Sequence, residues 1–241
     1  MEWLDRAVVL SVRPFGERDA VVSLFAREHG RHPGLVRGGQ GRRHGPVLQP
    51  GNELQAQWRA RLADQLGAFT VELLRPRAGV MLASAPALAG LSALTALLDL
   101  CLPEREPHAR LFDGLIVLLD AMEAGGPWPA LMVRFELELL AELGYGLDLS
   151  SCAVTGETED LTHVSPRSGR AVSAAAAAPY GDRLLRLPGF LAGRPEQGGN
   201  VLAGFALTGH FLEQRVLAPQ GRALPAARGR LLALLGRGGA I

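Results

Sequence analysis

The first 75 residues contain five short runs of apolar and polar side chains that read as β-strands. Each run carries Val, Leu, Phe or Trp, and each is bounded by Gly, Pro, Asn or Asp, which favour turns. The predicted strands are residues 6–12, 20–26, 31–37, 53–61 and 68–74. Five strands this short and this close in sequence fit a small closed barrel, and this is the tightest constraint on the fold.

After residues 76–79 the strand-like alternation ends and apolar residues recur at helical spacing. Helices are predicted over residues 84–102, 110–122, 128–143, 201–217 and 223–235, with a loop over 193–200. The expected fold class is therefore α+β, with a five-stranded β-barrel of the OB type in residues 1–79 and a mainly α-helical domain in residues 80–241. Barrels of the OB type mostly bind oligonucleotides or oligosaccharides, so the chain is a candidate nucleic-acid-binding protein.

A polar stretch interrupts the helical domain between residues 152 and 173. It is rich in Thr, Ser, Gly and Asp and is too short to be a separate domain. A hairpin is predicted there, with strands near residues 161–166 and 170–173. We expect the stretch to form a compact insert at about residues 150–178.

The net charge of +1 conceals an asymmetry between the two parts of the chain. Residues 1–80 carry twelve arginines against eight acidic residues, whereas residues 81–241 carry thirteen against sixteen. The basic excess therefore lies on the predicted barrel, where a nucleic-acid-binding face needs it. The sequence contains no lysine, and arginine offers planar, bidentate contacts to phosphate.

Composition places the chain among ordered globular proteins, with 48% hydrophobic residues. It contains no apolar run long enough to span a membrane, and its first residues lack the order of a signal peptide. Two cysteines, Cys101 and Cys152, give no disulfide framework. We expect a cytoplasmic protein that does not associate with membranes.

Several short phrases follow one another along the chain. In the barrel they are Phe15-Gly16-Glu17-Arg18-Asp19, His29-Gly30, Arg37-Gly38-Gly39 and Leu48-Gln49-Pro50-Gly51. In the second domain they are Arg134-Phe135-Glu136-Leu137, Leu143-Gly144-Tyr145-Gly146, Val164-Ser165-Pro166 and Ser168-Gly169-Arg170-Ala171-Val172-Ser173. By the order and spacing of these phrases, and by its length, the chain resembles the bacterial RecO family of DNA-repair and recombination-mediator proteins. The resemblance covers nearly the whole chain.

The resemblance implies an OB barrel followed by a helical domain. It also implies binding of single- and double-stranded DNA and annealing of complementary strands. The implied partners are RecR and the C-terminal tail of single-strand-binding protein, and RecA indirectly, because the family helps to load RecA. The implied location is the bacterial cytoplasm, in association with the nucleoid.

The sequence departs from this family in the insert, where many relatives carry a zinc-binding module with two C-x-x-C pairs. Here Cys152-Ala153-Val154-Thr155 keeps only the first cysteine, and Ser173-Ala174-Ala175-Ala176 keeps none. A structural zinc site needs four nitrogen or sulfur ligands, and Cys152 with His163 does not supply them. We therefore expect a zinc-finger-like insert without zinc, and no cofactor.

The strongest candidates for DNA contact are Arg37, Arg42 and Arg43, in or beside a Gly-rich loop between two predicted strands. A flexible backbone there would let a guanidinium group follow a phosphate. The alternative interpretation is a solvated basic loop that keeps the barrel soluble.

Further arginines extend the candidate DNA path. Arg59 and Arg61 are two residues apart, which puts them on one face of a strand. Arg13, beside Phe15, is a further candidate at the barrel rim. Trp58 and Phe69 raise the question of base stacking, but alternation favours a core position for Trp58. With both rings in the core, binding would be mainly electrostatic and nearly blind to sequence.

Arg134 and Phe135 are the candidate partner-binding residues in the helical domain. One interpretation is a basic rim on an apolar groove that accepts the acidic, Phe-ended tail of single-strand-binding protein. The other is a surface ion pair between Arg134 and Glu138, one helical turn apart.

The sequence contains no recognisable catalytic motif, so we expect a protein that is not an enzyme. The first hypothesis is a DNA-binding recombination mediator. A second is a protein–protein adaptor whose basic barrel is incidental, and a third is an RNA-binding OB module.

Overall fold

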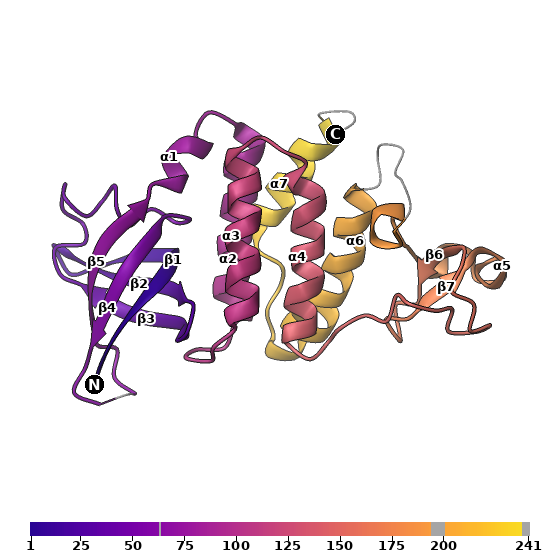
Figure 1. The fold of residues 1–241 in the computed structure, drawn as a ribbon, viewed down its shortest axis with the longest axis horizontal. Coiled ribbons are helices and arrows are strands. Elements are labelled where there is room, and N and C mark those ends of the chain that lie inside the picture. The colour runs from indigo at the N-terminus through magenta and orange to yellow at the C-terminus, as the bar shows by residue number, and fades with distance from the viewer. Residues whose placement is uncertain (63, 194–200, 238–241) are drawn as a thin grey trace. The chain divides into compact units, whose positions relative to one another are not determined.

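The computed structural model describes residues 1–62, 64–193 and 201–237 (Figure 1). The chain forms two compact units. The first comprises Met1–Gly126 together with Pro225–Leu231, and the second comprises Pro127–Leu224 with the residues from Leu232 onward. The predicted loop over residues 193–200 lies, apart from Gly193, outside the described residues.

The first unit contains all five predicted strands. They are β1 (Glu2–Phe15), β2 (Asp19–Ala26), β3 (Gly30–Val36), β4 (Glu53–Arg59) and β5 (Ala68–Arg75). The strands close into a barrel in the order β1-β2-β3-β5-β4, because β4 pairs with both β5 and the first half of β1. Only the β3–β5 pairing is parallel. The α+β prediction, with an N-terminal OB-type barrel, is confirmed.

The boundaries of β1 and β4 differ from the prediction by more than one residue. β1 begins four residues earlier than predicted and ends three residues later, because its two halves pair with different partners, β4 and β2. β4 ends at Arg59 and not at residue 61. Arg61 therefore lies in the connection to β5, where strand alternation does not fix the direction of its side chain.

The barrel interior is filled by the inward-facing residues of all five strands. Small residues such as Ala7 and Ala56 alternate there with larger ones such as Leu24 and Trp58. In β1, alternation puts Ala7 and Val9 inside the barrel and Val8 and Leu10 on its outer side, where helix α2 contacts the strand. Residues 7–10 are therefore buried on both faces.

One end of the barrel interior holds an aromatic cluster around His32. The imidazole of His32 is 3% exposed, and its Nδ1 lies 3.0 Å from the carbonyl oxygen of Pro33. Its ring contacts Trp3, Trp58 and Phe69, with a centroid distance of 4.7 Å to Trp58. Burial lowers the pKa of His32, since the charged form would lose its hydration.

This pKa shift predicts that the barrel loses stability in mild acid. The folded state holds His32 neutral at pH values where the unfolded chain, with an ordinary pKa near 6.5, already binds a proton. The unfolding free energy should therefore fall as the pH decreases below about 6.5. A His32→Asn variant keeps a donor for the carbonyl of Pro33 but does not titrate. Urea unfolding between pH 7.5 and 5.5 should show a smaller pH dependence for the variant, and equal dependence would contradict the assignment.

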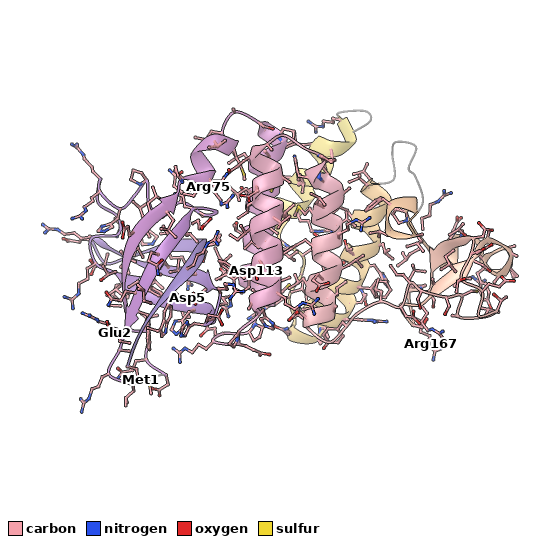
Figure 2. All side chains as sticks on the ribbon, in the orientation of Figure 1. Met1, Glu2, Asp5, Arg75, Asp113 and Arg167 are labelled. Atoms are coloured by element: carbon pink, nitrogen blue, oxygen red, sulfur yellow. The ribbon has the colours of Figure 1, made fainter. Side chains whose placement is uncertain are left out.

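Three helices follow the barrel in the first unit: α1 (Arg77–Met81), α2 (Ala85–Cys101) and α3 (Ala109–Glu123). Helices α2 and α3 contact each other, and they overlap in the view of Figure 1. Phe25 on β2 packs edge-on against Phe112 on α3, with ring centroids 5.5 Å apart. Arg27, which directly follows β2, donates two hydrogen bonds of 2.8 Å to the carboxylate of Asp113 on α3. Asp113 is labelled in Figure 2. The helices are thus joined to the barrel by both apolar and charged contacts.

A partly buried cluster of ion pairs forms a second connection between the barrel and α3. The guanidinium group of Arg77 is fully buried and donates to Glu53 on β4 at 2.9 Å and to Asp120 and Glu123 on α3 at 2.6 and 3.2 Å. Arg6 also pairs with Glu53, and Arg75, labelled in Figure 2, pairs with the two acids of α3. Three arginines and three carboxylates balance one another in this cluster.

The second unit is mainly helical. Its long helices are α4 (Trp128–Glu142) and α6 (Val201–Phe211), and α6 continues into a π-helical turn at Leu212–Leu217. Gly204 lets these helices approach closely, because a Cβ atom there would lie 2.9 Å from a methyl group of Val133. Thr208 on α6 donates a hydrogen bond to the buried carboxylate of Glu136 on α4. The last helix is α7 (Ala226–Arg237), whose residues up to Leu231 belong to the first unit. No helix of the described residues is long and apolar enough to cross a membrane.

The insert in the second unit contains the predicted hairpin, β6 (Leu161–Val164) and β7 (Ala171–Ser173), and a third strand that was not predicted, β8 (Leu185–Arg186). Short helices α5 (Ala174–Ala177), η1 (Gly181–Arg183) and η2 (Gly189–Leu191) accompany them. Arg170 pairs with Asp148 at 3.2 Å, and the backbone N–H of Ala153 donates to Ala171 at 2.8 Å. These polar contacts, together with the burial of Leu161, Val164 and Ala171, hold the insert together.

The donors around Cys152 do not form a zinc site. Its buried sulfur accepts a hydrogen bond of 3.3 Å from the backbone N–H of Ser173. Burial alone would raise the pKa of this thiol, but hydrogen bonds from Ser173 and Thr155 outweigh burial, and the pKa falls to about 6. Within residues 1–62, 64–193 and 201–237, no three His, Cys, Asp or Glu side chains lie close enough together to hold a metal ion. The residues present therefore do not fit the zinc module of the relatives.

Candidate nucleic-acid interface

Two segments of the first unit meet at one end of the barrel and form a surface that we call the basic ledge. The first is the end of β1 and its turn into β2, residues 13–19. The second is the loop that follows β3, residues 37–46. The backbone N–H of Gly38 donates to the carboxylate of Asp19 at 2.8 Å, and the N–H of Gln40 donates to the carbonyl of Arg18 at 3.0 Å. The two segments therefore behave as one piece of surface.

The side chain of Gln40 ties the loop to the turn more firmly. Its amide nitrogen donates to the carbonyl oxygens of Gly16 at 3.1 Å and Asp19 at 2.8 Å. Gly39 packs so closely that a Cβ atom would lie 2.6 Å from the Cβ of Ala20. The loop expected to be flexible is thus an ordered series of turns fixed to its neighbour. Such fixation lowers the conformational entropy that a ligand would otherwise have to remove on binding.

The ledge carries five arginines that form no ion pair with another described residue. All five side chains are exposed, and within the described part of the chain their guanidinium groups make no ion pair or hydrogen bond. They are Arg13, Arg18, Arg37, Arg42 and Arg43. The only acids on the ledge are Glu17 and Asp19, and the carboxylate of Asp19 accepts a hydrogen bond from the N–H of Gly38. The ledge thus has an excess of three positive charges.

The structure therefore brings Arg13 together with Arg37, Arg42 and Arg43, which the sequence had named as separate candidates, and adds Arg18. From the sequence alone, Arg18 and Gln40 were not candidates, and Phe15 entered only beside Arg13 and within a family phrase. Strict alternation from Ala7 and Val9 would turn Phe15 inward, so the sequence carried no signal for it. A β-bulge between Val9 and Ser11 shifts the alternation, so that Val12 faces the barrel core and Arg13 and Phe15 face outward.

Arg59 and Arg61 occupy a different position. Arg59 donates to Glu2 at 2.7 Å, and this hydrogen bond is the main reason that the pKa of Glu2 is lowered. The strand register connects Arg59 to the ledge through a row of cross-strand neighbours on the outer face: Arg13, Val21, Leu35, Ala68 and Arg59. Four strand-to-strand steps of about 4.8 Å separate the two ends of this row. Arg59 therefore lies on the same outer face as Arg13, at the opposite end of this row.

The aromatic rings of the barrel mostly lie inside it. Trp58 is 2% exposed and Phe69 is 5% exposed, as alternation predicts for Trp58. The indole N–H of Trp58 donates to the carbonyl of Leu66 at 3.0 Å. Neither ring is placed to stack on a base.

The two residues predicted to bind a partner lie on α4 in the second unit. Arg134 is exposed, donates to the backbone carbonyl of Phe190 and lies over the ring of that residue, 5.9 Å from its centroid. It does not form the alternative ion pair with Glu138. Phe135 is 6% exposed and belongs to the core of its unit. The structure therefore leaves Arg134 on the surface and Phe135 beneath it.

Comparison with known proteins covers both units. The family "Recombination protein O N terminal" matches residues 1–77, and "Recombination protein O C terminal" matches residues 83–223. The chain belongs to the RecO family. It is 54% identical to the "DNA repair protein RecO" of Cereibacter sphaeroides, over 99% of this chain and all of the relative. Proteins of the same name from Rhodospirillum rubrum and Methylorubrum extorquens are 51% and 50% identical, over 97–98% of each chain. Membership of the RecO family supports a role in DNA repair and recombination.

Proposed function

We propose that this RecO-family protein is a DNA-binding recombination mediator without enzymatic turnover. It binds single- and double-stranded DNA, anneals complementary strands, and with RecR helps to load RecA onto strands covered by single-strand-binding protein. The observation that carries the DNA-binding part is the basic ledge, where five exposed and unpaired arginines lie on two segments held together by hydrogen bonds. Family membership supports the remaining parts.

The ledge would promote annealing by electrostatics alone. Two complementary strands repel one another through their phosphates, and bound arginines reduce this repulsion where the strands meet. Each phosphate contact also releases condensed counterions, so binding becomes weaker as salt rises. No covalent bond is made or broken in such a step.

The helical unit would recruit the other proteins. Arg134 is the proposed cation for the acidic tail of single-strand-binding protein. Its contacts within the described residues are a neutral carbonyl and an aromatic ring, so no acid there neutralises its charge. Phe135 would act beneath it by shaping the surface, because its ring is buried.

Replacement of Arg37, Arg42 and Arg43 by alanine tests the proposed DNA site. Loss of three phosphate contacts should reduce the slope of log affinity against log salt by about 2 for a single strand, and weaken binding about 100-fold near 0.1 M salt. The measurement is fluorescence anisotropy of a labelled single strand of about 30 nucleotides, several times the length that one OB barrel covers, over a salt series. A matched control removes three exposed arginines of the insert: Arg167, Arg183 and Arg186.

The outcomes separate the hypotheses. Weak binding with a shallow slope in the ledge variant, and unchanged binding in the control, would support the ledge as the DNA site. Equal loss in both variants would indicate a response to net charge only. If the wild-type protein does not bind DNA at low salt, the adaptor hypothesis gains, and tighter binding of a matched RNA strand would favour the RNA-binding alternative.

A further inference from the structure

The outer face of the barrel beside the ledge has an apolar floor between charged borders. Cross-strand pairs place Val21 on β2 next to Leu35 on β3, and Leu35 next to Ala68 on β5. All three side chains are half-buried. Arg13 borders this floor on one side and Arg59 on the other. Phosphates at the borders and apolar base faces over the floor would both find complementary surroundings.

Phe15 stands at the edge of this floor. It is the next outward-facing residue after Arg13 on β1, and its ring is 56% exposed. Among the described aromatic residues of β1 to β5 it is the only exposed ring, since Trp3 is half-buried and the others lie in the core. Leaving a ring of this size in water costs free energy that a core position would recover.

The backbone that carries this ring is also held in a fixed place. Phe15 pairs with Asp19 across the turn, and the backbone of that turn is bound by Gln40. A side chain on a rigid turn loses little conformational freedom when a ligand covers it. Arg13 and Arg18, two and three residues from it along the chain, make no ion pair among the described residues. The acids nearby are Glu17 and Asp19, and the carboxylate of Asp19 accepts a hydrogen bond from the N–H of Gly38.

We propose that Phe15, with the floor of Val21, Leu35 and Ala68, is a stacking surface for bases of an unpaired DNA strand. The inference rests on the proposed function, because the arginines of the ledge must hold the phosphates. It also gives the arginines and Phe15 different roles in binding. The arginines bind single strands and duplexes alike, whereas Phe15 favours the single strand, because only unpaired bases offer a free face.

Phe15→Ala tests this division. Base–aromatic stacking is worth enough that the variant should bind a single strand about 5- to 100-fold more weakly. It should bind a duplex as the wild type does and keep the wild-type salt slope, since no phosphate contact is lost. Phe15→Tyr retains an aromatic ring and should restore binding. Val80→Ala is the matched control, because Val80 is an apolar side chain of similar exposure, 54%, in the same unit but on α1.

Two readouts distinguish stacking from an indirect effect. An abasic strand of equal length has phosphates but no bases, so the wild type and Phe15→Ala should bind it equally. A strand with a fluorescent adenine analogue should be quenched by the wild type and less so by the variant. Equal weakening on normal and abasic strands would overturn the inference, because Phe15 would then only support the ledge.

Failure of the inference and failure of the proposed function give different results. If the wild type binds with a steep salt slope and Phe15→Ala binds single strands equally well, the stacking surface is wrong and the ledge stands. If the wild type does not bind DNA, both are wrong. Thermal unfolding of Phe15→Ala should match the wild type, since an exposed ring contributes little to folding.

Discussion

Replacing Arg77 with methionine is expected to lower the free energy of unfolding by about 3–5 kcal/mol. Methionine fills much of the same volume, so the main loss is the charge. Glu53, whose side chain is 6% exposed, would keep only Arg6, which is 43% exposed. A buried carboxylate without adequate pairing is costly because it cannot recover its lost hydration. Chemical unfolding monitored by circular dichroism would measure the effect.

Arg75 provides a matched control for this variant. It pairs with the same two acids of α3, Asp120 and Glu123, but its side chain is 48% exposed. Solvent screens its charge, so Arg75→Met should cost no more than about 1 kcal/mol. Similar losses for Arg75→Met and Arg77→Met would show that burial does not distinguish the two ion pairs.

The pH dependence of Arg77→Met separates a charge effect from a packing effect. In the wild type, burial opposes ionisation of Glu53, but hydrogen bonds from Arg6 and Arg77 outweigh it and lower its pKa. This contribution to stability is present above the unfolded value of about 4.5 and is lost as the pH falls through the folded pKa. In the variant, Glu53 loses the hydrogen bonds from Arg77, so burial raises its pKa relative to the wild type. Protonation of Glu53 then removes the cost of burying its charge. The stability difference between the two proteins should therefore shrink below about pH 4.5, whereas a packing defect would persist.

The sequence predicted the barrel strands but not the cluster of ion pairs around Arg77. Short apolar runs between turn residues are local signals, and all five corresponded to strands. Arg77 follows a strand and precedes Ala78 and Gly79, a pattern that normally indicates an exposed arginine. Its partners, Glu53 and Asp120, are 24 and 43 residues away in sequence. Such long-range pairing leaves no periodic signal.

The same contrast between local sequence signals and long-range contacts applies to the candidate site. A local excess of arginines in residues 1–80 pointed to the loop after β3, and Arg37, Arg42 and Arg43 are exposed there. What the sequence could not show is that Gln40 fixes this loop to the β1–β2 turn. That contact depends on hydrogen bonds to the carbonyls of Gly16 and Asp19, which any residue type could offer. Arg18 and Phe15 became part of the site only through it.

The second large effect is expected for Trp58. The ring packs against His32 and Trp3, with centroids 4.7 and 5.9 Å away, and its indole N–H binds the carbonyl of Leu66. Gly67 lies so close that a Cβ atom would be 2.3 Å from the indole nitrogen. Trp58→Ala should therefore lower the free energy of unfolding by about 3–5 kcal/mol, through lost burial and the cavity left behind. Urea unfolding monitored by circular dichroism would measure it.

A milder substitution decides whether Trp58 also contacts DNA. Trp58→Phe keeps most of the apolar volume and loses the hydrogen bond to Leu66, which contributes about 1 kcal/mol. The variant should remain folded and bind a single strand as the wild type does, because a ring 2% exposed has no free face for a base. Phe15→Ala should show the reverse, with normal stability and weaker binding. If Trp58→Phe unfolds like the wild type but loses DNA affinity, then the barrel must open to bind DNA, and stacking would involve its interior as well as its outer face.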